Sequence, residues 1–501
     1  MTRVLLGQSY YLRFDPKLWQ AMQPYPPLGT LYAASALRER GYEVALFDAM
    51  LEDSEERWGE ALERHRPDVA VLFEDNFNYL SKMCLLRMRE AAFRMLELAR
   101  AAGCLAIVCG SDATDHPAAY LDHGAGYVVV GEGEATLGEL LDRLTGRADG
   151  APAAVVGLTV RTADGSLVST GRRENLRELD AVPFPAWDLV AIERYRAAWA
   201  SHGRFSMNMS TTRGCPFHCN WCAKPIWGQR YAVRSPENVV AELSWLRSAF
   251  GPDHISFVDD IFGLRPGWVR TFADLVRERG LVTPFKCLSR ADLLLREGEV
   301  TALGEAGCEM VWMGAESGSQ QVLDAMDKGT KVEQIVAAAE RLHAAGIGVG
   351  FFLQFGYPGE GPADIEATRR LVRAGRPDDI GFSVSYPLPG TRFYDRVKAD
   401  LGVKQNWLDS NDLAMLYEGP YSTRFYRHLH EVVHKEFRLR RAAGTRSVPV
   451  HLARAALRPR SHERLARARD AVTLPLDEVV LAGLQRLQRR PAPRTLEVIG
   501  P

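Results

Sequence analysis

Three cysteines lie within eight positions of one another, in the stretch Thr211-Thr-Arg-Gly-Cys-Pro-Phe-His-Cys-Asn-Trp-Cys222. Their spacing is Cys215-x-x-x-Cys219-x-x-Cys222. Thiolates are the usual ligands of iron–sulfur clusters, and three of them leave one iron of a four-iron cube without a protein ligand. The spacing therefore predicts a [4Fe-4S] cluster whose open iron can bind a small-molecule chelator.

Two other interpretations of these cysteines are open. The first is a zinc site with His218 as the fourth ligand, but structural zinc sites more often use paired Cys-x-x-Cys units. The second is a set of core thiols, since free cysteine is often buried. Three cysteines in one short loop that also contains Gly214 and Pro216 are a poor core pattern, so the cluster is favoured.

The elements that must position these cysteines form a series of strands and helices. Phe205, Met207 and Met209 alternate with polar residues and predict a strand that ends just before the cysteine loop. Six βα units predict a partial (β/α)6 TIM barrel, in which catalytic residues follow the carboxyl ends of the strands. The six strands are expected near residues 206–210, 254–258, 285–288, 310–314, 348–354 and 380–384.

Polar residues follow the other strands of this predicted barrel and form a candidate ring around one cavity. Such residue types suit a ligand that carries an ammonium, a carboxylate and a ribose diol. A salt bridge at the barrel mouth or a helix cap is the alternative for each of them. The ring comprises Asp259, Asp260, Ser289, Arg290, Glu316, Ser317 and Gly356.

With the aromatic Trp221 before the last cysteine, the motif resembles the signature of the radical S-adenosylmethionine (SAM) superfamily. The resemblance implies that SAM chelates the open iron and is cleaved by one electron to methionine and a 5'-deoxyadenosyl radical, which abstracts hydrogen from a substrate. It also implies an external electron donor of the flavodoxin or ferredoxin type. Its candidate SAM contacts are Ser289 and Arg290 for the carboxylate, Asp259 and Asp260 for the amino group, Glu316 for the ribose and Trp221 for the adenine, with Ser317 and Gly356 in the same ring. The Asp-Asp pair departs from the Gly-Gly-Glu of many members.

Residues 1–145 predict a second α/β domain. Strands near residues 4–6, 44–47, 69–73, 105–109 and 127–130 alternate with helices near residues 28–39, 83–101 and 136–144. This alternation predicts a Rossmann-like, doubly wound parallel sheet. The connection over residues 7–27 is long for such a sheet, and long ordered loops are usually functional.

The domain also resembles the cobalamin (B12)-binding domain of one radical SAM subgroup, which includes hopanoid methylases and the anaerobic magnesium-protoporphyrin ester cyclase. The similar stretches are Pro26–Ala34, Gly41–Val44 with Asp48, Gly110–Thr114 and Gly131–Glu134. The resemblance implies cobalamin, with candidate contacts Gly29, Gly110, Ser111, Asp112, Gly131 and Gly133. No Asp-x-His-x-x-Gly occurs, which predicts a cobalt without a histidine ligand, and Asp112 stands where relatives often have histidine.

A docking domain without any corrin is the alternative for this sheet, because a Rossmann-like fold does not specify its ligand. A methylthiotransferase would instead need a second cluster, for which Cys84, Cys104 and Cys109 are available. Cys104 and Cys109 are five positions apart on one expected strand and so face opposite sides of the sheet.

The remaining segments carry weaker signals. Residues 146–200 predict a linker with a short strand pair, residues 201–400 the barrel, and residues 401–501 a helical, arginine-rich region that includes Leu452–Leu457 and Leu465–Asp470. The arginines suit an acidic carrier protein or an anionic substrate. Amphipathic helices with a solvated basic face that close the open side of the barrel are the favoured interpretation.

Composition limits the function classes. The 501 residues are 46% hydrophobic and 25% charged, and 62 basic against 63 acidic residues give a net charge of -1. These values favour neither a nucleic-acid partner nor a membrane. Eight cysteines do not form a disulfide scaffold, and no signal or membrane-spanning segment is predicted, so a cytoplasmic location is expected.

The resulting hypothesis is a cobalamin-dependent radical SAM enzyme, with methyl transfer to an unactivated carbon of a small molecule. Cyclisation, oxidation or rearrangement with the same cofactors is the first alternative. A non-catalytic iron–sulfur, cobalamin-binding or electron-transfer protein is the second. Pure electron transfer usually has a fully ligated cluster, which disfavours the second alternative.

Overall fold

The computed structural model describes residues 2–83, 85–222, 226–444 and 461–487. Cys84 and the stretch Leu452–Leu457 lie outside the described residues. The chain divides into two units. The first contains Met1–Pro216, Ala223–Asp260 and Asn406–Asp412, and the second contains Phe217–Cys222, Ile261–Gln405 and Leu413–Pro501.

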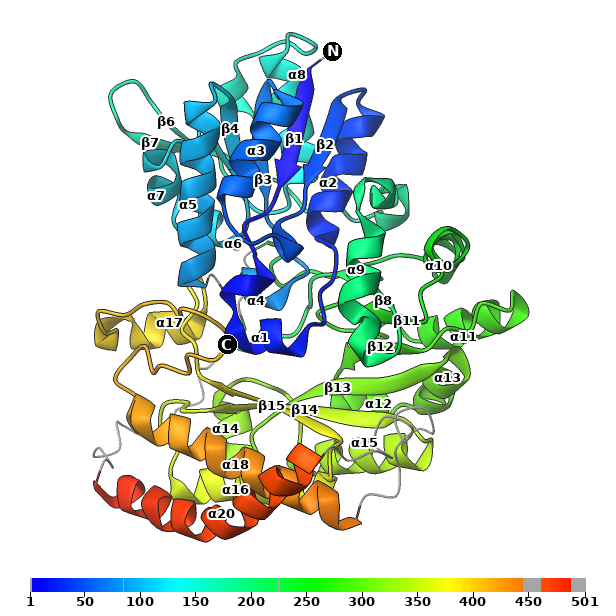
Figure 1. Ribbon diagram of the computed structural model, residues 1–501, viewed down its shortest axis with the longest axis vertical. Coiled ribbons are helices and arrows are strands. Elements are labelled where there is room, and N and C mark those ends of the chain that lie inside the picture. Colours follow the sequence, from blue (N-terminus) through cyan, green and yellow to red (C-terminus); the bar gives the residue numbers. More distant parts are fainter. Residues whose placement is uncertain (1, 84, 223–225, 445–460, 488–501) are drawn as a thin grey trace. The chain divides into compact units, whose positions relative to one another are not determined.

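The first unit begins with a seven-stranded sheet in the order β2-β1-β3-β4-β5-β6-β7 (Figure 1). Strands β1 to β5 are parallel, and the chain reverses its direction of winding between β1 and β3, which makes this the switch point where doubly wound sheets bind ligands. The strands are β1 (Arg3–Gly7), β2 (Glu43–Phe47), β3 (Val69–Phe73), β4 (Leu105–Cys109), β5 (Tyr127–Val129), β6 (Leu158–Arg161) and β7 (Leu167–Ser169).

Helices cover both faces of this sheet, as predicted. Alternate residues of β1 face the two hydrophobic cores of the sheet. Leu5 packs on the face covered by α3 (Glu56–His65) and α5 (Leu86–Ala101), while Val4 and Leu6 pack on the face covered by α2 (Leu28–Glu39) and α8 (Glu134–Leu144). The helices are α1 (Pro16–Ala21), α2 (Leu28–Glu39), α3 (Glu56–His65), α4 (Tyr79–Lys82), α5 (Leu86–Ala101), α6 (Ser111–Asp115), α7 (Pro117–Asp122) and α8 (Glu134–Leu144).

The segment predicted as a linker, residues 146–200, is structured. Its strand pair does not stand alone, because β6 pairs antiparallel with β5 and so extends the sheet. The edge of β5 offers backbone donors and acceptors that need partners, and β6 supplies them. Helix α9 (Ile192–Trp199) follows, and the side chains of Tyr195 and Trp199 are buried.

The second strand series begins in the same unit. Strand β8 (Ser206–Met209) pairs parallel with β11 (His254–Phe257), and the short β9 (Thr212–Arg213) pairs antiparallel with β10 (Ala232–Val233). Helix α10 (Pro236–Phe250) begins with a cap, in which the Ser235 side chain accepts a hydrogen bond from the backbone nitrogen of Asn238 at 3.1 Å.

The second unit continues the series, and the six-stranded sheet has the order β15-β14-β13-β12-β11-β8. The strands fall where the sequence predicts them, and the chain is an α/β protein with parallel sheets. They are β12 (Phe285–Ser289), β13 (Cys308–Glu316), β14 (Gly348–Phe355) and β15 (Asp379–Val384). The helices are α11 (Trp268–Glu278), α12 (Ala291–Leu294), α13 (Glu299–Ala306), α14 (Gln320–Ala325), α15 (Val332–Ala344), α16 (Pro362–Gly375) and α17 (Arg392–Val397).

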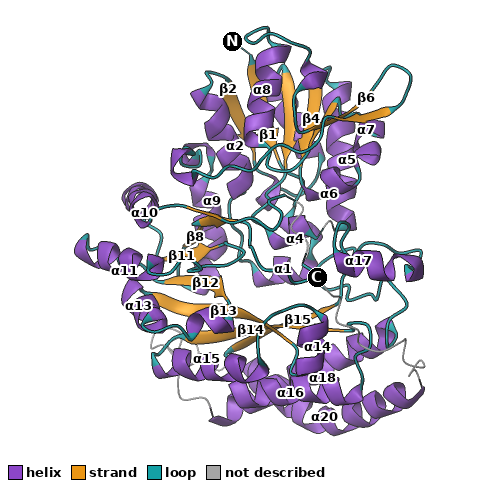
Figure 2. Cartoon of the chain, turned by 180° about the vertical axis from the view of Figure 1, so that it is seen from behind, coloured by secondary structure: helices purple, strands orange, loops and turns teal. Residues whose placement is uncertain are grey.

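The C-terminal region was predicted to be helical from residue 401, but its described part is helical only from Thr423 onward, and residues 401–422 form turns and irregular structure. Helices α18 (Thr423–Gly444) and α20 (Ser461–Leu487) pack on each other, beside α16 (Figure 2). Phe425, Leu429 and Val432 of α18 are buried and form its apolar stripe. Among the described residues, no helix has the length and the apolar character that crossing a membrane requires.

Candidate active site

The cysteine loop leaves β9 through a glycine that no other residue can replace. Gly214 has φ +80°, and a Cβ at this position would collide with the backbone carbonyl of Arg230. Only glycine adopts such a conformation without strain. The tight approach sets the direction in which Cys215 enters the loop.

Asp259, at the end of β11, holds the backbone that precedes this loop. Its carboxylate accepts hydrogen bonds from the backbone nitrogens and hydroxyls of Thr211 and Thr212, at distances from 2.5 to 3.1 Å. Ser210 Oγ adds a hydrogen bond of 3.2 Å. Burial raises the pKa of Asp259 to about 6, while these hydrogen bonds oppose the shift. Asp259 is thus occupied by protein donors and fixes the strand end next to the cysteines.

The second half of the loop is anchored by Asn220, which lies between two of the cysteines. Its backbone nitrogen donates to the carbonyl of Met326 at 3.0 Å, and its side chain donates to the carbonyl of Ala325 at 2.7 Å. The hydroxyl of Tyr357 donates to Asn220 Oδ1 at 3.0 Å. The segment around Cys219 is therefore tied to the end of α14.

Trp221 packs beside an apolar cluster of the second unit that includes Val322, Met326 and Tyr357. Its Nε1 is buried and has no hydrogen-bond partner among the described residues. A buried N–H without an acceptor is costly, which makes it a natural place for a ligand acceptor. Trp221 was predicted beside the adenine, and this orphan donor suits that position.

Ser289 is the last residue of β12, and Arg290 follows the strand. The guanidinium of Arg290 stacks 3.6 Å from the ring centre of Phe217 in the cysteine loop. Arg290 also forms an ion pair with Asp292 at 3.0 Å and donates to the backbone carbonyl of Lys328 at 3.0 Å. Ser289 Oγ donates to the carbonyl of Phe262 at 3.3 Å.

Glu316 ends β13 in an unusual conformation. Its φ is +55°, and the pairing of β13 with β14 has a register shift at this residue. A non-glycine residue with positive φ is uncommon and concentrates at functional sites. Its carboxylate accepts a hydrogen bond from Lys328 Nζ at 2.8 Å, and both side chains are buried. Lys328 was not among the predicted site residues, and its only signal in the sequence is the Lys328-Gly329 turn after a short helix.

The other members of the predicted ring contact protein groups. Asp260 pairs with Lys82 Nζ of α4 at 2.6 Å. Ser317 Oγ lies 3.1 Å from Thr368 Oγ1, and its hydroxyl is buried. Gly356 has φ +81° and donates its backbone N–H to Glu360 at 2.6 Å.

The three cysteines are half-buried. Within the described residues, no three His, Cys, Asp or Glu side chains are gathered as the ligands of a single metal ion. A cluster places a different demand on its ligands, because each thiolate binds its own iron. A short loop with three thiols, together with the cations Arg290 and Lys328 of the second unit, fits an anionic iron–sulfur cluster.

Residues at the switch point of the first sheet contain buried polar atoms. Ser9, after β1, donates its backbone N–H to Glu74, after β3, at 3.1 Å. Ser9 Oγ, Tyr10 OH, Glu74 Oε1 and Ser111 Oγ are all buried without a hydrogen-bond partner in the described part of the chain. A ligand with amide donors and acceptors around its edge would satisfy such atoms, and the side chains of a corrin have this chemistry.

The glycines predicted for cobalamin are explained first by packing within the protein. A Cβ on Gly110 would lie 2.8 Å from the Glu74 side chain, and one on Gly133 would collide with Cys109. Gly131 has φ +80°. Gly29 donates its backbone N–H to Asp75 Oδ1 at 2.9 Å.

Asp112 is also held by protein groups. It forms two hydrogen bonds with the guanidinium of Arg89, at 2.6 and 2.5 Å, and accepts a third from Tyr120 OH at 2.7 Å. Asp112 is thus one partner of an ion pair with Arg89 and is itself buried. Its neighbour Ser111 keeps an unpartnered hydroxyl.

Arg213 connects the segment just before the cysteine loop with the Gly131–Glu134 stretch. Its guanidinium forms ion pairs with Glu132 and, at 2.8 Å, with Glu134, and all three side chains are at most 8% exposed. The Gly131–Glu134 stretch therefore binds the residue that lies two positions before Cys215. This contact was not predicted, because nothing local in the sequence indicates which acidic residues Arg213 meets.

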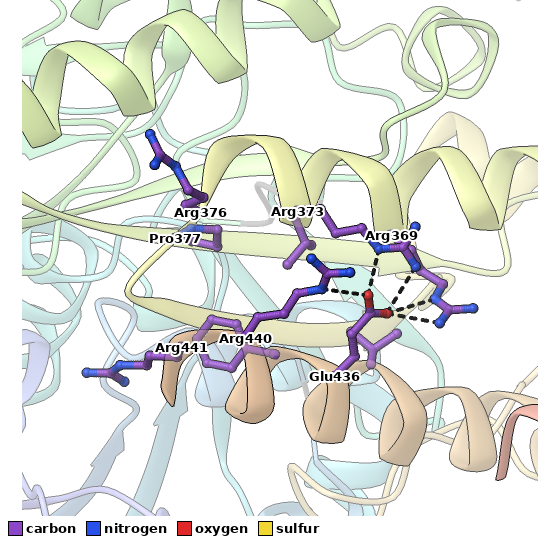
Figure 3. A pocket seen from close by; sticks show the side chains of 10 residues that line it. Arg369, Arg373, Arg376, Pro377, Glu436, Arg440 and Arg441 are labelled. Atoms are coloured by element: carbon purple, nitrogen blue, oxygen red, sulfur yellow. Dashed lines mark hydrogen bonds and ion pairs between the residues drawn. The ribbon is translucent and has the colours of Figure 1, made fainter. Parts of the chain in front are cut away.

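A pocket of about 270 Å³ lies elsewhere in the second unit, between α16 and α18. Figure 3 shows Glu436 facing Arg369 and Arg373, while Arg376 and Arg441 point away from it. Glu436 pairs with Arg369 at 2.9 Å, with Arg373 at 2.6 Å and with the neighbouring Arg440 at 2.9 Å. This ion network fastens α18 to the barrel helix α16.

Replacing Glu436 by glutamine is expected to lower the free energy of unfolding by about 3 kcal/mol at pH 7. Burial alone would raise the pKa of Glu436, but the hydrogen bonds from Arg373 and Arg369 lower it to about 2. A carboxylate with a lowered pKa stabilises the fold above its unfolded pKa and loses this effect as the pH falls toward 2. Urea unfolding between pH 7 and pH 3 should therefore show that the difference in free energy of unfolding between the wild type and Glu436→Gln becomes smaller as the pH falls. Glu333→Gln, at an exposed position of α15, is the control. An equal difference at all pH values would contradict this role.

Two family models match consecutive parts of the chain. Residues 209–372 match the model of the radical SAM superfamily, and residues 20–141 match the model of the B12 binding domain. The fold and the cysteine loop define an iron–sulfur enzyme with a doubly wound domain before a βα-barrel domain. The chain thus carries a radical SAM domain and, before it in the sequence, a B12-binding domain. The radical SAM domain implies a [4Fe-4S] cluster and SAM, and the B12-binding domain implies cobalamin.

Several curated proteins are similar to the chain. The uncharacterized methyltransferase PH0819 of Pyrococcus horikoshii is 27% identical over 76% of this chain and 81% of its own length. The bacteriochlorophyllide d C-12(1)-methyltransferase of Chlorobaculum tepidum is 26% identical over 37% of this chain and 41% of its own. The anaerobic magnesium-protoporphyrin IX monomethyl ester cyclase of Rubrivivax gelatinosus is 25% identical over 47% of this chain and 42% of its own. The chain thus spans most of the first relative and about two fifths of the other two.

Two solved structures share the fold. The cobalamin-dependent SAM radical enzyme OxsB, with aqua-cobalamin and SAM bound, has a TM-score of 0.72 at 17% identity and covers 97% of this chain and 75% of its own. The radical SAM methyltransferase TsrM of Kitasatospora setae, with cobalamin and a [4Fe-4S] cluster bound, has a TM-score of 0.65 at 20% identity. The match covers 79% of this chain and 78% of the TsrM chain. At these identities the likeness shows the fold alone.

Proposed function

We propose that the protein is a cobalamin-dependent radical SAM methyltransferase that acts on an unactivated carbon of a small molecule. The observation that carries the proposal is the presence in one chain of the three-cysteine loop after a barrel strand and of a B12-binding sheet. Relatives named as methyltransferases support methyl transfer as the reaction. When bound, the cluster supplies the electron that cleaves SAM and so starts radical chemistry.

In this proposal Cys215, Cys219 and Cys222 bind three irons of the cluster. The ring that receives SAM is Trp221, Asp260, Ser289, Arg290, Glu316 and Gly356, with Asp259 and Ser317 shaping the backbone around it. The guanidinium of Arg290 is suited to a carboxylate, because its planar fork donates two parallel hydrogen bonds. The unpartnered Nε1 of Trp221 supports an acceptor nearby.

For cobalamin, we place the ligand at the switch point of the first sheet, beside Gly29, Gly110 and Ser111, with Gly131 and Gly133 shaping the adjacent loop and Asp112 holding α6. The buried, unpartnered hydroxyls of Ser9 and Ser111 support this placement. A small external redox protein of the flavodoxin or ferredoxin type is the proposed electron donor.

The test is anaerobic reconstitution of the full chain with iron, sulfide and cobalamin, followed by dithionite and SAM. We expect about four irons and one cobalamin per chain, and 5'-deoxyadenosine that forms only when the reductant is present. S-adenosylhomocysteine should also form, in an amount limited by the bound cobalamin, because in this incubation the reduced cobalamin would be the acceptor of the methyl group of SAM. A fully loaded chain that forms no 5'-deoxyadenosine would refute the radical reaction.

Radical cyclisation with the same cofactors is the second candidate, because a cyclase is among the similar proteins. The same incubation separates the two reactions. Formation of 5'-deoxyadenosine without any S-adenosylhomocysteine, in the presence of methylatable cobalamin, would favour cyclisation, oxidation or rearrangement over methyl transfer.

A further inference from the structure

Lys328 is a buried cation in the second unit with no assigned role. Its side chain is 8% exposed and contacts Glu316, which is 6% exposed, at 2.8 Å. Gly314 makes room for this pair, because a Cβ there would collide with both Lys328 Nζ and Glu316 Oε1. A buried ion pair with space reserved for it, beside a residue of positive φ, is typical of a functional constraint.

Two independent sets of contacts place Lys328 close to Cys219. The backbone and side chain of Asn220 bind the carbonyls of Met326 and Ala325, only two and three positions before Lys328. From the other side, Arg290 stacks on Phe217 and donates to the carbonyl of Lys328. The loop that carries Cys219 is thus bonded on both sides to the turn that carries Lys328.

The charge on Lys328 persists in this buried position. Burial lowers the pKa of its ammonium group, but Glu316 and the Cys219 thiol raise it, and the net pKa lies above the usual value. Arg290 opposes this with a smaller effect. The ammonium group therefore presents a positive charge toward both Glu316 and Cys219 at neutral pH.

We infer that Lys328 is a positioning residue of the active site, which orients the Glu316 carboxylate and sets the reduction potential of the cluster bound through Cys219. This inference rests on the proposed cluster site. Reduction adds one electron to an already anionic group, so a nearby buried cation stabilises the reduced state and a nearby carboxylate destabilises it. Glu316 and Lys328 should therefore shift the potential in opposite directions.

The test is a redox titration of the reconstituted full chain, followed by electron paramagnetic resonance of the reduced cluster. Lys328→Met should reduce the ratio of reduced to oxidised cluster about tenfold at a fixed applied potential. For a one-electron couple this corresponds to a fall in the reduction potential of about 59 mV. Glu316→Gln should raise the potential. Lys328→Arg should stay near the wild type, and the exposed Lys331→Met is the matched control for loss of one lysine charge from the same loop.

A double variant keeps the inference testable if Lys328→Met does not fold. Glu316→Gln with Lys328→Met removes both charges, which buried pairs tolerate better than loss of one partner, and its potential should lie near the wild type. SAM added to the reduced cluster should change the spectrum of the wild type and change it less in both single variants. Wild-type potential and wild-type SAM response in all variants would overturn the role of Lys328. A wild-type chain that assembles no cluster would instead overturn the proposed function.

Discussion

Replacing Cys219 by alanine abolishes the formation of 5'-deoxyadenosine and reduces the iron content of the reconstituted chain. With two thiolates left, the cube loses one of its three protein anchors and cannot keep the geometry in which a single iron stays open. Cys215→Ala and Cys222→Ala should have the same effect. The measurements are iron per chain, visible absorbance and 5'-deoxyadenosine after addition of dithionite and SAM.

The matched control is Cys308→Ala, which removes a buried thiol at the start of β13. This variant should keep both the cluster and SAM cleavage. Because Asn220, Phe217 and Gly214 hold the loop backbone, the cysteine variants should also keep their thermal unfolding midpoint in the absence of iron. Full SAM cleavage by Cys219→Ala would exclude the three-cysteine cluster as the reaction centre.

Replacing Arg213 by alanine destabilises the first unit by about 3–5 kcal/mol, because Glu132 and Glu134 are left as buried, uncompensated charges. Burial already raises the pKa of Glu132, and Arg213 opposes that shift. Without the guanidinium, the pKa of Glu132 should rise further, because burial still raises it and Arg213 no longer opposes the shift. The loss of stability should therefore be larger at pH 8 than at pH 5.5, where protonation relieves the repulsion.

Urea unfolding of the chain before reconstitution measures this effect. Arg270→Ala is the control, since Arg270 forms its ion pairs on an exposed surface of α11 and should matter far less. The variant Glu132→Gln/Glu134→Gln with Arg213→Met removes the whole group and should recover part of the stability. If Arg213→Ala unfolds like the wild type at every pH, the ion pairs are not a stabilising contact.

Much of the fold follows from local patterns. The strands β11, β12 and β15 lie within a residue or two of their predicted positions, because alternating or continuous apolar residues identify a strand without reference to its partners. The Ser235 cap of α10 is equally local, since it depends only on the residue and its next turn. The strand pair β6 and β7 was also predicted, but as part of a linker, because the sequence does not show that β6 pairs with the edge of β5.

The candidate site divides in the same way. The spacing of Cys215, Cys219 and Cys222 alone indicated the chemistry, because cluster ligands in one loop need no distant partner. By contrast, Arg213 meets Glu132 across 81 positions of the sequence, and Lys82 meets Asp260 across 178. Such pairs carry no local signal, since any of many charged residues could satisfy either partner.

The sequence by itself therefore determined the class of fold, the cluster loop and the chemical family of the protein, all of which reside in short-range periodicity and spacing. Only the tertiary structure decided which polar residues are already bound by protein groups, as Asp259 and Asp112 are, and which buried atoms remain unpartnered, as Trp221 Nε1 does. The physical reason is that hydrogen-bond satisfaction and burial depend on the whole surrounding shell of residues, which is assembled from segments far apart along the chain.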